Sequence, residues 1–171
     1  MKDLLVSVEE YLSTSFDPDC EYIDGIIVER NVGERDHSYW QMELGGYLTA
    51  RRRALGIYVF SEFRMQIRPT RFRIPDLTIV AGEWPEERVL RHPPFLVVEI
   101  WSPDDRPSEM QSKIRDYREL GIPYILVIYP DELRFVLYTA DGEQELEDGV
   151  LRTQNPTIEI PLLEIYAGFK N

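Results

Sequence analysis

The chain has 171 residues, of which 43% are hydrophobic and 12% aromatic, and its formal net charge is -12. These values exclude a disordered chain and allow a single domain, residues 1–171, whose core needs no disulfide because Cys20 is the only cysteine. No apolar run approaches the roughly 20 residues that a membrane helix requires, and the start "MKDLLVSVEEYL" has acidic residues where a signal peptide would be apolar. We therefore expect a soluble cytoplasmic protein.

The arginines are concentrated in one part of this acidic chain. Between Arg30 and Arg73 nine arginines stand against four acidic residues, so this segment carries +5 and the remainder -17. A basic surface would suit a phosphate-bearing partner, although solvated arginines at a helix end and a hairpin would give the same pattern. The candidates for the basic surface are Arg51, Arg52, Arg53, Arg64, Arg68, Arg71 and Arg73.

The first half of the chain predicts helix, hairpin and helix. Ser7 followed by Glu10 forms a capping-box pattern and predicts a short helix over Ser7–Ser13. Asp24-Gly25 lies between two β-rich arms in "EYIDGIIVER", which is a strong hairpin signal. An apolar stripe at helical spacing then predicts a helix from Arg35 to Leu55, which Gly56 is placed to end.

The second half predicts strands around one further helix. "IYVFSEFRMQIRP", "FRIPDLTIVAG" and "FLVVEI" read as strands, followed by a helix from Pro107 to Leu120 that Gly121 closes. "YILVIY" and "LRFVLYT" read as two paired strands, and short strands near Val150 and Ile158 are expected at the periphery. The sequence thus predicts a mixed β-sheet flanked by helices, in the α/β class, with an N-terminal β-hairpin.

Two of the predicted strands each carry one carboxylate among apolar residues. Because side chains alternate between the two faces of a strand, Asp76 shares a face with Thr78, and Glu99 shares a face with Val97. If these strands are neighbours, Asp76 and Glu99 form a two-carboxylate site suited to a hard cation such as Mg²⁺. The alternatives are a strand-start role for Asp76 after Pro75 and an ion pair with arginine for Glu99.

A lysine on the following helix is the simplest partner for Glu99. Taking about 100° per residue, Lys113 falls inside the apolar stripe formed by Met110, Ile114 and Tyr117. A lysine at this position could neutralise the carboxylate or act on a substrate nearby. It could also be a lysine whose stem merely covers the edge of the core.

Two further residues are candidates for the same site. His37 precedes Trp40 by three residues and so lies on the apolar stripe of the long helix, where it could bind a metal, move a proton or be a satisfied helix-start histidine. The role of Glu21, at the entry to the first hairpin, is left equally open.

Four stretches resemble a known protein family when taken in order. "CEYIDGIIVE" before a helix containing His37, then "IPDLTIV", "PFLVVEIWSPDD" and "EMQSKIRDYRELGIPYILVI" resemble the Uma-two family, whose members are described as restriction endonucleases of the PD-(D/E)XK nuclease superfamily. The likeness runs from about Glu21 to Tyr138. It implies a restriction-endonuclease-like core in which Asp76 and Glu99 bind a divalent metal, Mg²⁺ or Mn²⁺, and in which His37 supports catalysis.

The chain departs from the superfamily pattern at one position. The catalytic lysine usually follows the second acid by two residues, and here that position is Trp101. The resemblance places a lysine in the next helix instead, and Lys113 matches it. By analogy, Lys113 would orient or activate water beside the metal and offset the charge that develops on the scissile phosphate.

Three hypotheses about function follow. The first is a Mg²⁺-dependent endonuclease whose partner is nucleic acid, with DNA preferred. The second is a nuclease-like protein that binds or regulates without catalysis, which Trp101, the acidic charge and the lack of a DNA-reading motif favour. The third is a structural domain, with a homodimer as one form, whose acidic residues only complete ion pairs.

Overall fold

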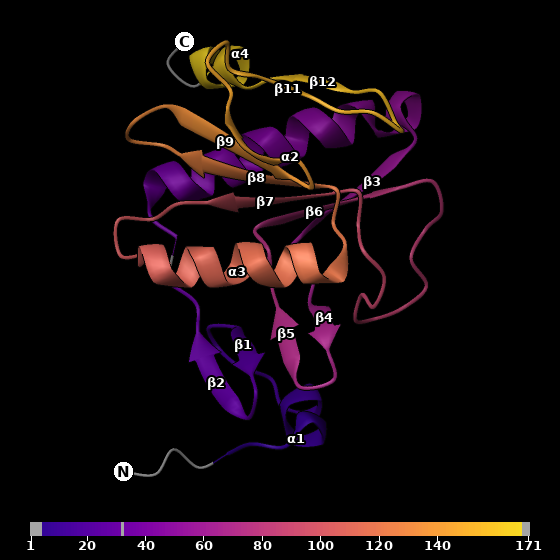
Figure 1. The fold of residues 1–171 in the computed structure, drawn as a ribbon, viewed down its shortest axis with the longest axis vertical. Coiled ribbons are helices and arrows are strands. Elements are labelled where there is room, and N and C mark those ends of the chain that lie inside the picture. Colours follow the sequence, from indigo (N-terminus) through magenta and orange to yellow (C-terminus); the bar gives the residue numbers. More distant parts are fainter. Residues whose placement is uncertain (1–4, 32, 169–171) are drawn as a thin grey trace.

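The computed structural model describes residues 5–31 and 33–168, and a six-stranded mixed sheet forms its centre (Figure 1). The strand order is β10-β9-β8-β7-β6-β3. β7 and β8 are parallel because a helix, α3, crosses over between them, whereas the other neighbours are antiparallel. The strand bounds are β3 Ile57–Ser61, β6 Leu77–Ala81, β7 Leu96–Ile100, β8 Tyr124–Tyr129, β9 Arg134–Thr139 and β10 Gly142–Glu145.

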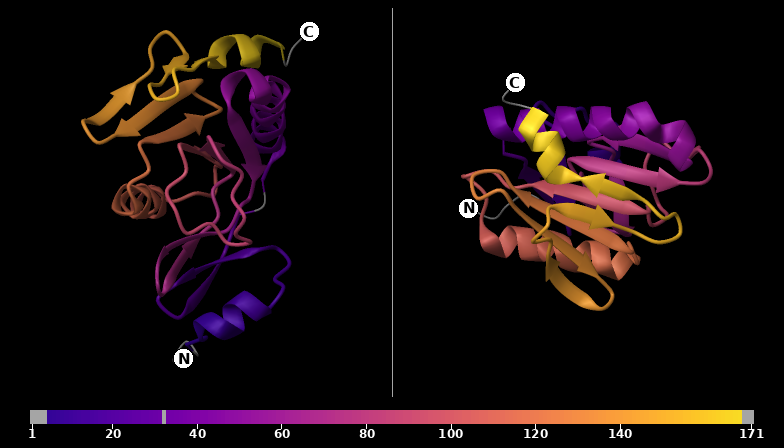
Figure 2. Two further views of the ribbon diagram at one scale, coloured as in Figure 1. Left: turned by 90° about the vertical axis from the view of Figure 1, so that its right-hand side faces the viewer. Right: turned by 90° about the horizontal axis from the view of Figure 1, so that it is seen from above.

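One long helix covers each face of this sheet (Figure 2). α2, Arg35–Leu55, packs its buried stripe of Trp40, Leu44 and Leu48 against one face. α3, Pro107–Leu120, packs Met110, Ile114 and Tyr117 against the other. Both helices have the predicted bounds and end at a glycine with positive φ, Gly56 after α2 and Gly121 after α3.

A second, smaller sheet lies beneath the first and has the order β2-β1-β5-β4. Its strands are β1 Cys20–Ile23, β2 Ile26–Glu29, β4 Met65–Arg68 and β5 Arg71–Arg73. The predicted hairpin at Asp24-Gly25 joins β1 to β2, and both turn residues have positive φ, which is why the short turn needs these residue types. α1, Val8–Ser13, packs Tyr11 onto the sheet.

After α2 has led from the small sheet to the large one, the chain crosses directly between the two sheets twice more, and the sequence did not predict these two crossings. "IYVFSEFRMQIRP" is divided into β3 and β4, with a break at Glu62, whose φ is +52°. "FRIPDLTIVAG" is divided into β5 and β6 at Pro75, which has no N–H to donate to a strand ladder. Because the second crossing precedes β6, Asp76 lies at the junction of the two sheets.

The C-terminal segment is part of the core, so the expectation of a peripheral position was wrong. β11 (Val150–Arg152) pairs with β12 (Glu159–Pro161), and α4 (Leu162–Ala167) follows them above α2 (Figure 1). Leu151, Ile160 and Leu162 are buried in the same cluster as the α2 stripe. The sequence did not reveal α4 because six residues are too few to show helical periodicity. None of the helices in the described part of the chain is long and apolar enough to cross a membrane.

Candidate active site

Asp76 is held at the sheet junction by three donors from three segments of the chain. Its Oδ1 accepts a hydrogen bond from Arg30 Nη2 at 2.9 Å, and its Oδ2 accepts one from the backbone N–H of Ile100 at 2.7 Å. His37 Nε2 lies 3.1 Å from the same Oδ2. These contacts satisfy a carboxylate that is only 4% exposed.

Glu99 lies beside Asp76 because β6 and β7 are antiparallel neighbours. Leu77 pairs with Val98 in this ladder, so continuing the register by one residue places Asp76 opposite Glu99. The structure therefore confirms that the strands carrying Asp76 and Glu99 are neighbours, which the alternation of side chains along each strand could not establish. Glu99 is 2% exposed, which explains why a carboxylate within an apolar strand needs specific partners.

α3 supplies both partners of Glu99. Lys113 Nζ donates to Glu99 Oε2 at 2.9 Å, and the Tyr117 hydroxyl donates to Glu99 Oε1. Lys113 Nζ also lies 3.7 Å from Glu21 Oε1, so one ammonium group bridges two buried carboxylates. The predicted inward direction of Lys113 is therefore confirmed, and Glu21, whose role was left open, joins the same cluster.

Trp101 does not occupy the place of a lysine in this cluster. It packs against Tyr129, with ring centroids 5.5 Å apart, and borders the hydrophobic cluster beneath α3. It is absent from the lining of the pocket that contains Asp76 and Glu99. The amine nearest to Glu99 in the described structure is thus that of Lys113.

Arg73 is a central residue of the site that sequence reasoning misassigned. It is 3% exposed, and it forms ion pairs with Glu21 at 2.7 Å and with Asp116 at 2.6 Å. Its expected place on a basic surface was wrong, because β5 turns this side chain between the hairpin and α3. Arg71 is also bound to Asp116, at 2.9 Å.

The remaining arginines form no continuous basic surface around the site. Arg64 is paired with Asp19 at 3.0 Å, and Arg68 lies 3.7 Å from Asp24. Arg51, Arg52 and Arg53 are exposed at the far end of α2. Asp116, Arg30 and the Tyr117 hydroxyl were missed as partners in the cluster, since each bonds to residues distant in the sequence. The one signal present was that Tyr117 lies on the same helical stripe as Lys113.

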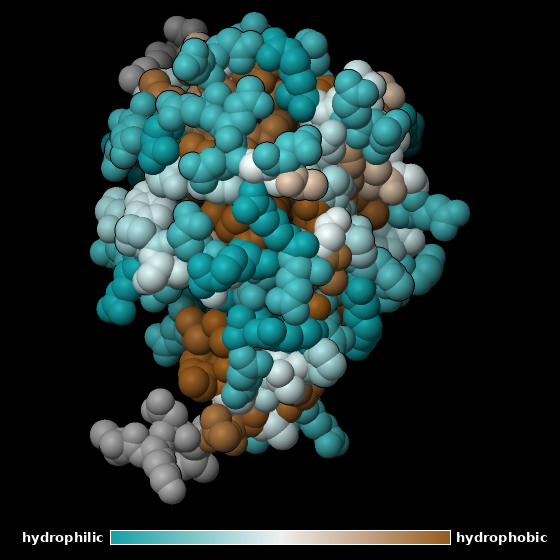
Figure 3. Space-filling view, viewed as in Figure 1, coloured by the Kyte–Doolittle hydropathy of each residue, from teal (hydrophilic) through white to brown (hydrophobic). Residues whose placement is uncertain are grey.

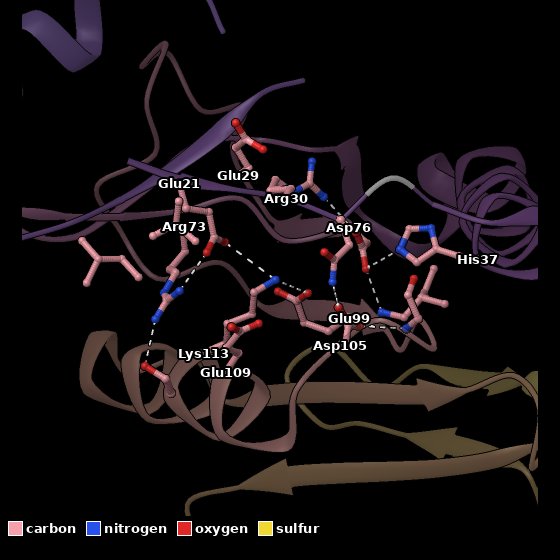
Figure 4. A pocket seen from close by; sticks show the side chains of 16 residues that line it. Glu21, Glu29, Arg30, His37, Arg73, Asp76, Glu99, Asp105, Glu109 and Lys113 are labelled. Atoms are coloured by element: carbon pink, nitrogen blue, oxygen red, sulfur yellow. Dashed lines mark hydrogen bonds and ion pairs between the residues drawn. The ribbon is translucent and has the colours of Figure 1, made fainter. Parts of the chain in front are cut away.

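A polar pocket of about 230 Å³ opens onto these groups (Figure 4). Six carboxylates and three permanent cations line it, which leaves a formal charge of -3 before His37 is counted. The carboxylates are Glu21, Glu29, Asp76, Glu99, Asp105 and Glu109, and the cations are Arg30, Arg73 and Lys113. Such a pocket attracts cations and repels a bare phosphate.

Burial and neighbouring charges shift the pKa values of both central acids. Burial, with the nearby charges of Asp76 and Glu21, raises the pKa of Glu99 to about 6 despite the opposing charge of Lys113. Burial alone would also raise the pKa of Asp76, but the hydrogen bond and charge of His37, together with the charges of Lys113 and Arg30, outweigh it and lower that pKa. The pKa of His37 is raised in turn by Asp76, against the effect of its own burial. Of the two carboxyl groups, Asp76 therefore ionises at lower pH than Glu99.

The raised pKa of Glu99 predicts how stability depends on pH without metal. The folded protein holds the proton of Glu99 more tightly than the unfolded chain does. The contribution of this proton to the free energy of unfolding is therefore complete below pH 4.5 and is lost as the pH rises through 6. We expect Glu99→Gln to stabilise the metal-free protein above pH 6 by an amount on the order of 2 kcal/mol, and to have little effect below pH 4.5. Urea unfolding with a chelator at several pH values measures this difference.

Glu83 is exposed in the loop after β6, and Glu83→Gln is the control. This variant should not reproduce the stabilisation that is expected of Glu99→Gln above pH 6. A Glu99→Gln variant that is less stable than the wild type at pH 7.5 would instead identify Glu99 as half of a structural ion pair, in agreement with the third hypothesis.

The donor chemistry of Asp76 and Glu99 fits a divalent cation such as Mg²⁺. Mg²⁺ is commonly bound by one or two carboxylates while it keeps several waters. Asp76 Oδ1 and both Glu99 oxygens each accept one hydrogen bond from the described residues, so each keeps a lone pair for a ligand bond. Within residues 5–31 and 33–168, no cluster of three His, Cys, Asp or Glu side chains is arranged around a metal position. Binding of Mg²⁺ therefore stays a prediction that rests on this pair.

Comparisons with known proteins identify the family. The family Uma2, described as "Putative restriction endonuclease", matches residues 8–167. The chain belongs to the Uma2 family. The crystal structure at 1.96 Å resolution of a "putative nuclease belonging to DUF820" from Anabaena variabilis ATCC 29413 is similar, with a TM-score of 0.81 and 18% sequence identity over 95% of this chain and 98% of that chain. At this identity the likeness establishes the fold, which confirms the restriction-endonuclease-like architecture. No curated protein matches the chain.

Proposed function

We propose that this Uma2 protein is a nuclease that hydrolyses phosphodiester bonds in DNA with the help of Mg²⁺. The observation that carries the proposal is the buried pair Asp76 and Glu99, with Lys113 Nζ 2.9 Å from Glu99. The description of the Uma2 family and the name of the Anabaena protein support a hydrolase acting on nucleic acid.

The residues around the pocket suit the steps of this reaction. When bound, Mg²⁺ would polarise the scissile phosphate and favour ionisation of a water molecule. Asp76 and Glu99 would hold the ion, and the Lys113 ammonium group would orient the attacking water and stabilise the charge that develops on the phosphate oxygens. His37 would fix the direction of Asp76 through its Nε2 contact. The acidic lining would disfavour a phosphate that arrives without the cation.

The N-terminal hairpin offers an apolar surface next to the pocket. Ile23 and Val28 line the pocket, and Ile26, on the same face of the hairpin, is 44% exposed. Figure 3 shows the hydrophobic surface over this hairpin beside hydrophilic surface. A deoxyribose or base on one side of the scissile phosphate could pack here, while the phosphate enters the polar part of the pocket.

Metal-dependent cleavage of DNA tests the proposal. We expect the wild-type protein to nick supercoiled plasmid DNA with Mg²⁺ or Mn²⁺ and to be inactive with a chelator. Asp76→Asn should lose cleavage by about two orders of magnitude or more. Added Mn²⁺ should raise the melting temperature of the wild type but not of Asp76→Asn, since binding to the folded state alone stabilises it.

A catalytically inactive binding protein is the second candidate, and one observation favours it. All four oxygens of Asp76 and Glu99 already accept hydrogen bonds from the protein, so each oxygen has a partner without a metal. Binding of nucleic acid or a protein partner that needs no metal and is unchanged in Asp76→Asn, with no cleavage under any condition, would support this candidate over the nuclease.

A further inference from the structure

Within residues 5–31 and 33–168, no strand pairs with the outer edge of β3. β3 is the last strand of the large sheet, and it pairs with β6 on its other side. Gly82 N donates a hydrogen bond to Gly56 O, and Glu62 N donates one to Asp76 O. These two bonds show which residues of β3 direct their backbone groups toward β6. In an antiparallel pair the bonding residues alternate, so the N–H and C=O groups of Ile57, Val59 and Ser61 point away from β6.

Both faces of β3 are covered, so its edge is the open part. Ile57 and Val59 pack into the cluster beneath α2 on one face. On the other face, the Trp84 ring lies 5.3 Å from the rings of both Tyr58 and Phe60. The strand reads "IYVFS" and contains no charge and no proline, although these are the usual means by which proteins protect an exposed edge.

A groove of about 570 Å³ lies between α2 and the second half of β3, and Leu77 at the start of β6 also lines it. Val59 and Ser61 line it from the strand, and α2 contributes a stripe of mostly small residues. The residues of α2 that line the groove are Ser38, Gln41, Met42, Gly45, Gly46 and Thr49. A Cβ atom added at Gly46 would meet nothing within 4 Å, and Met42 is 72% exposed. The helix therefore leaves room for another backbone beside β3.

We propose that β3 of a second copy of this chain occupies the edge, so that the two six-stranded sheets join into one across a two-fold axis. The strands pair antiparallel, with Val59 opposite Val59 of the partner and Ile57 opposite Ser61 of the partner. A two-fold axis perpendicular to the sheet keeps both α2 helices on the same face, where their small-residue stripes lie next to each other.

The charges at the two ends of β3 favour a second copy as the occupant. Arg52 and Arg53, in the last turn of α2, are exposed just before the strand begins. The Glu62 side chain, directly after the strand ends, forms an ion pair with Arg30 at 3.0 Å and is still 50% exposed, so it can also contact a cation of the partner. Antiparallel pairing brings the arginine end of each copy to the Glu62 end of the other, so the same charge pair forms twice.

The variant Gly46→Glu tests this interface without disturbing the fold. The side chain enters open space, and glycine is the weakest helix former apart from proline, so the helix should not suffer. From low micromolar to several hundred micromolar protein, light scattering should give a mass of about 40 kDa for the wild type, twice the 20.1 kDa of one chain. Gly46→Glu should give the monomer mass. Gly46→Ala, the matched control, should stay dimeric.

Amide exchange measured by NMR shows whether β3 itself forms the contact. The amides of Val59 and Ser61 should exchange at least about tenfold more slowly in the wild type than in Gly46→Glu. The amides of Tyr58 and Phe60, which face β6, should be protected in both proteins. A monomeric wild type would overturn the proposal, and so would a dimer that persists in Gly46→Glu while Val59 and Ser61 exchange rapidly.

Discussion

Replacing Lys113 by methionine is expected to reduce the proposed DNA cleavage by about two to four orders of magnitude. Methionine keeps much of the stem but removes the ammonium group that contacts Glu99 at 2.9 Å and Glu21 at 3.7 Å. Without it, no cation from α3 would offset the charge that develops on the phosphate. Single-turnover cleavage of a labelled DNA duplex under saturating Mg²⁺ measures the loss.

Metal binding separates this role from a structural one. Lys113 competes with a cation for Glu99, so Lys113→Met should bind Mn²⁺ at least as tightly as the wild type while cleaving far more slowly. Arg115→Met removes a positive charge from the exposed face of the same helix and should leave both properties unchanged. If Lys113→Met retained full activity in a folded protein, the assignment of this amine would be wrong.

The second large effect concerns stability. Arg73→Met should lower the free energy of unfolding by about 3–5 kcal/mol, because removing one partner of a buried ion pair leaves uncompensated charge. Here two buried carboxylates would each lose their shortest ion pair, since Arg73 contacts Glu21 at 2.7 Å and Asp116 at 2.6 Å. Of the ion pairs between described residues, Glu21 would keep only that with Lys113 at 3.7 Å, and Asp116 only that with Arg71 at 2.9 Å. Equilibrium unfolding in urea at neutral pH, followed by circular dichroism, measures the change.

A double variant checks the cause of that loss. Adding Glu21→Gln to Arg73→Met should recover part of the stability, because one of the two carboxylates that lost the Arg73 ion pair is no longer charged. Arg115→Met, which removes an exposed arginine, should stay within about 0.5 kcal/mol of the wild type. A cost below about 1 kcal/mol for Arg73→Met would contradict the buried network.

The features that the sequence predicted well depend on short-range geometry. Helical spacing located α2 and α3 and predicted that Lys113 faces the core, because residues three and four apart share one face of a helix. The Asp24-Gly25 turn was equally clear, since few residue types tolerate positive φ at both positions. The ordered motifs pointed to the Uma2 family, which the match over residues 8–167 confirmed.

The features that were missed depend on contacts between distant segments. Periodicity cannot show that a strand leaves one sheet for another, so the break at Glu62 was not foreseen, and a strand start after Pro75 was only one of two alternatives. For the same reason Arg73 was assigned to the surface, because alternation along a strand does not say which face is buried. The C-terminal strands were assigned to the periphery, although Leu151 and Ile160 lie in the same buried cluster as the α2 stripe.

The sequence by itself therefore identified Asp76 and Glu99 as carboxylates within apolar strands, directed Lys113 toward the core and indicated the family. Each is a property of residue type and local spacing. Only the tertiary structure decided that β6 lies beside β7, that Lys113 bridges Glu99 and Glu21, and that Arg73 closes the cluster. The physical reason is that these pairings gain their free energy from burial and charge compensation across the fold, which no single segment contains.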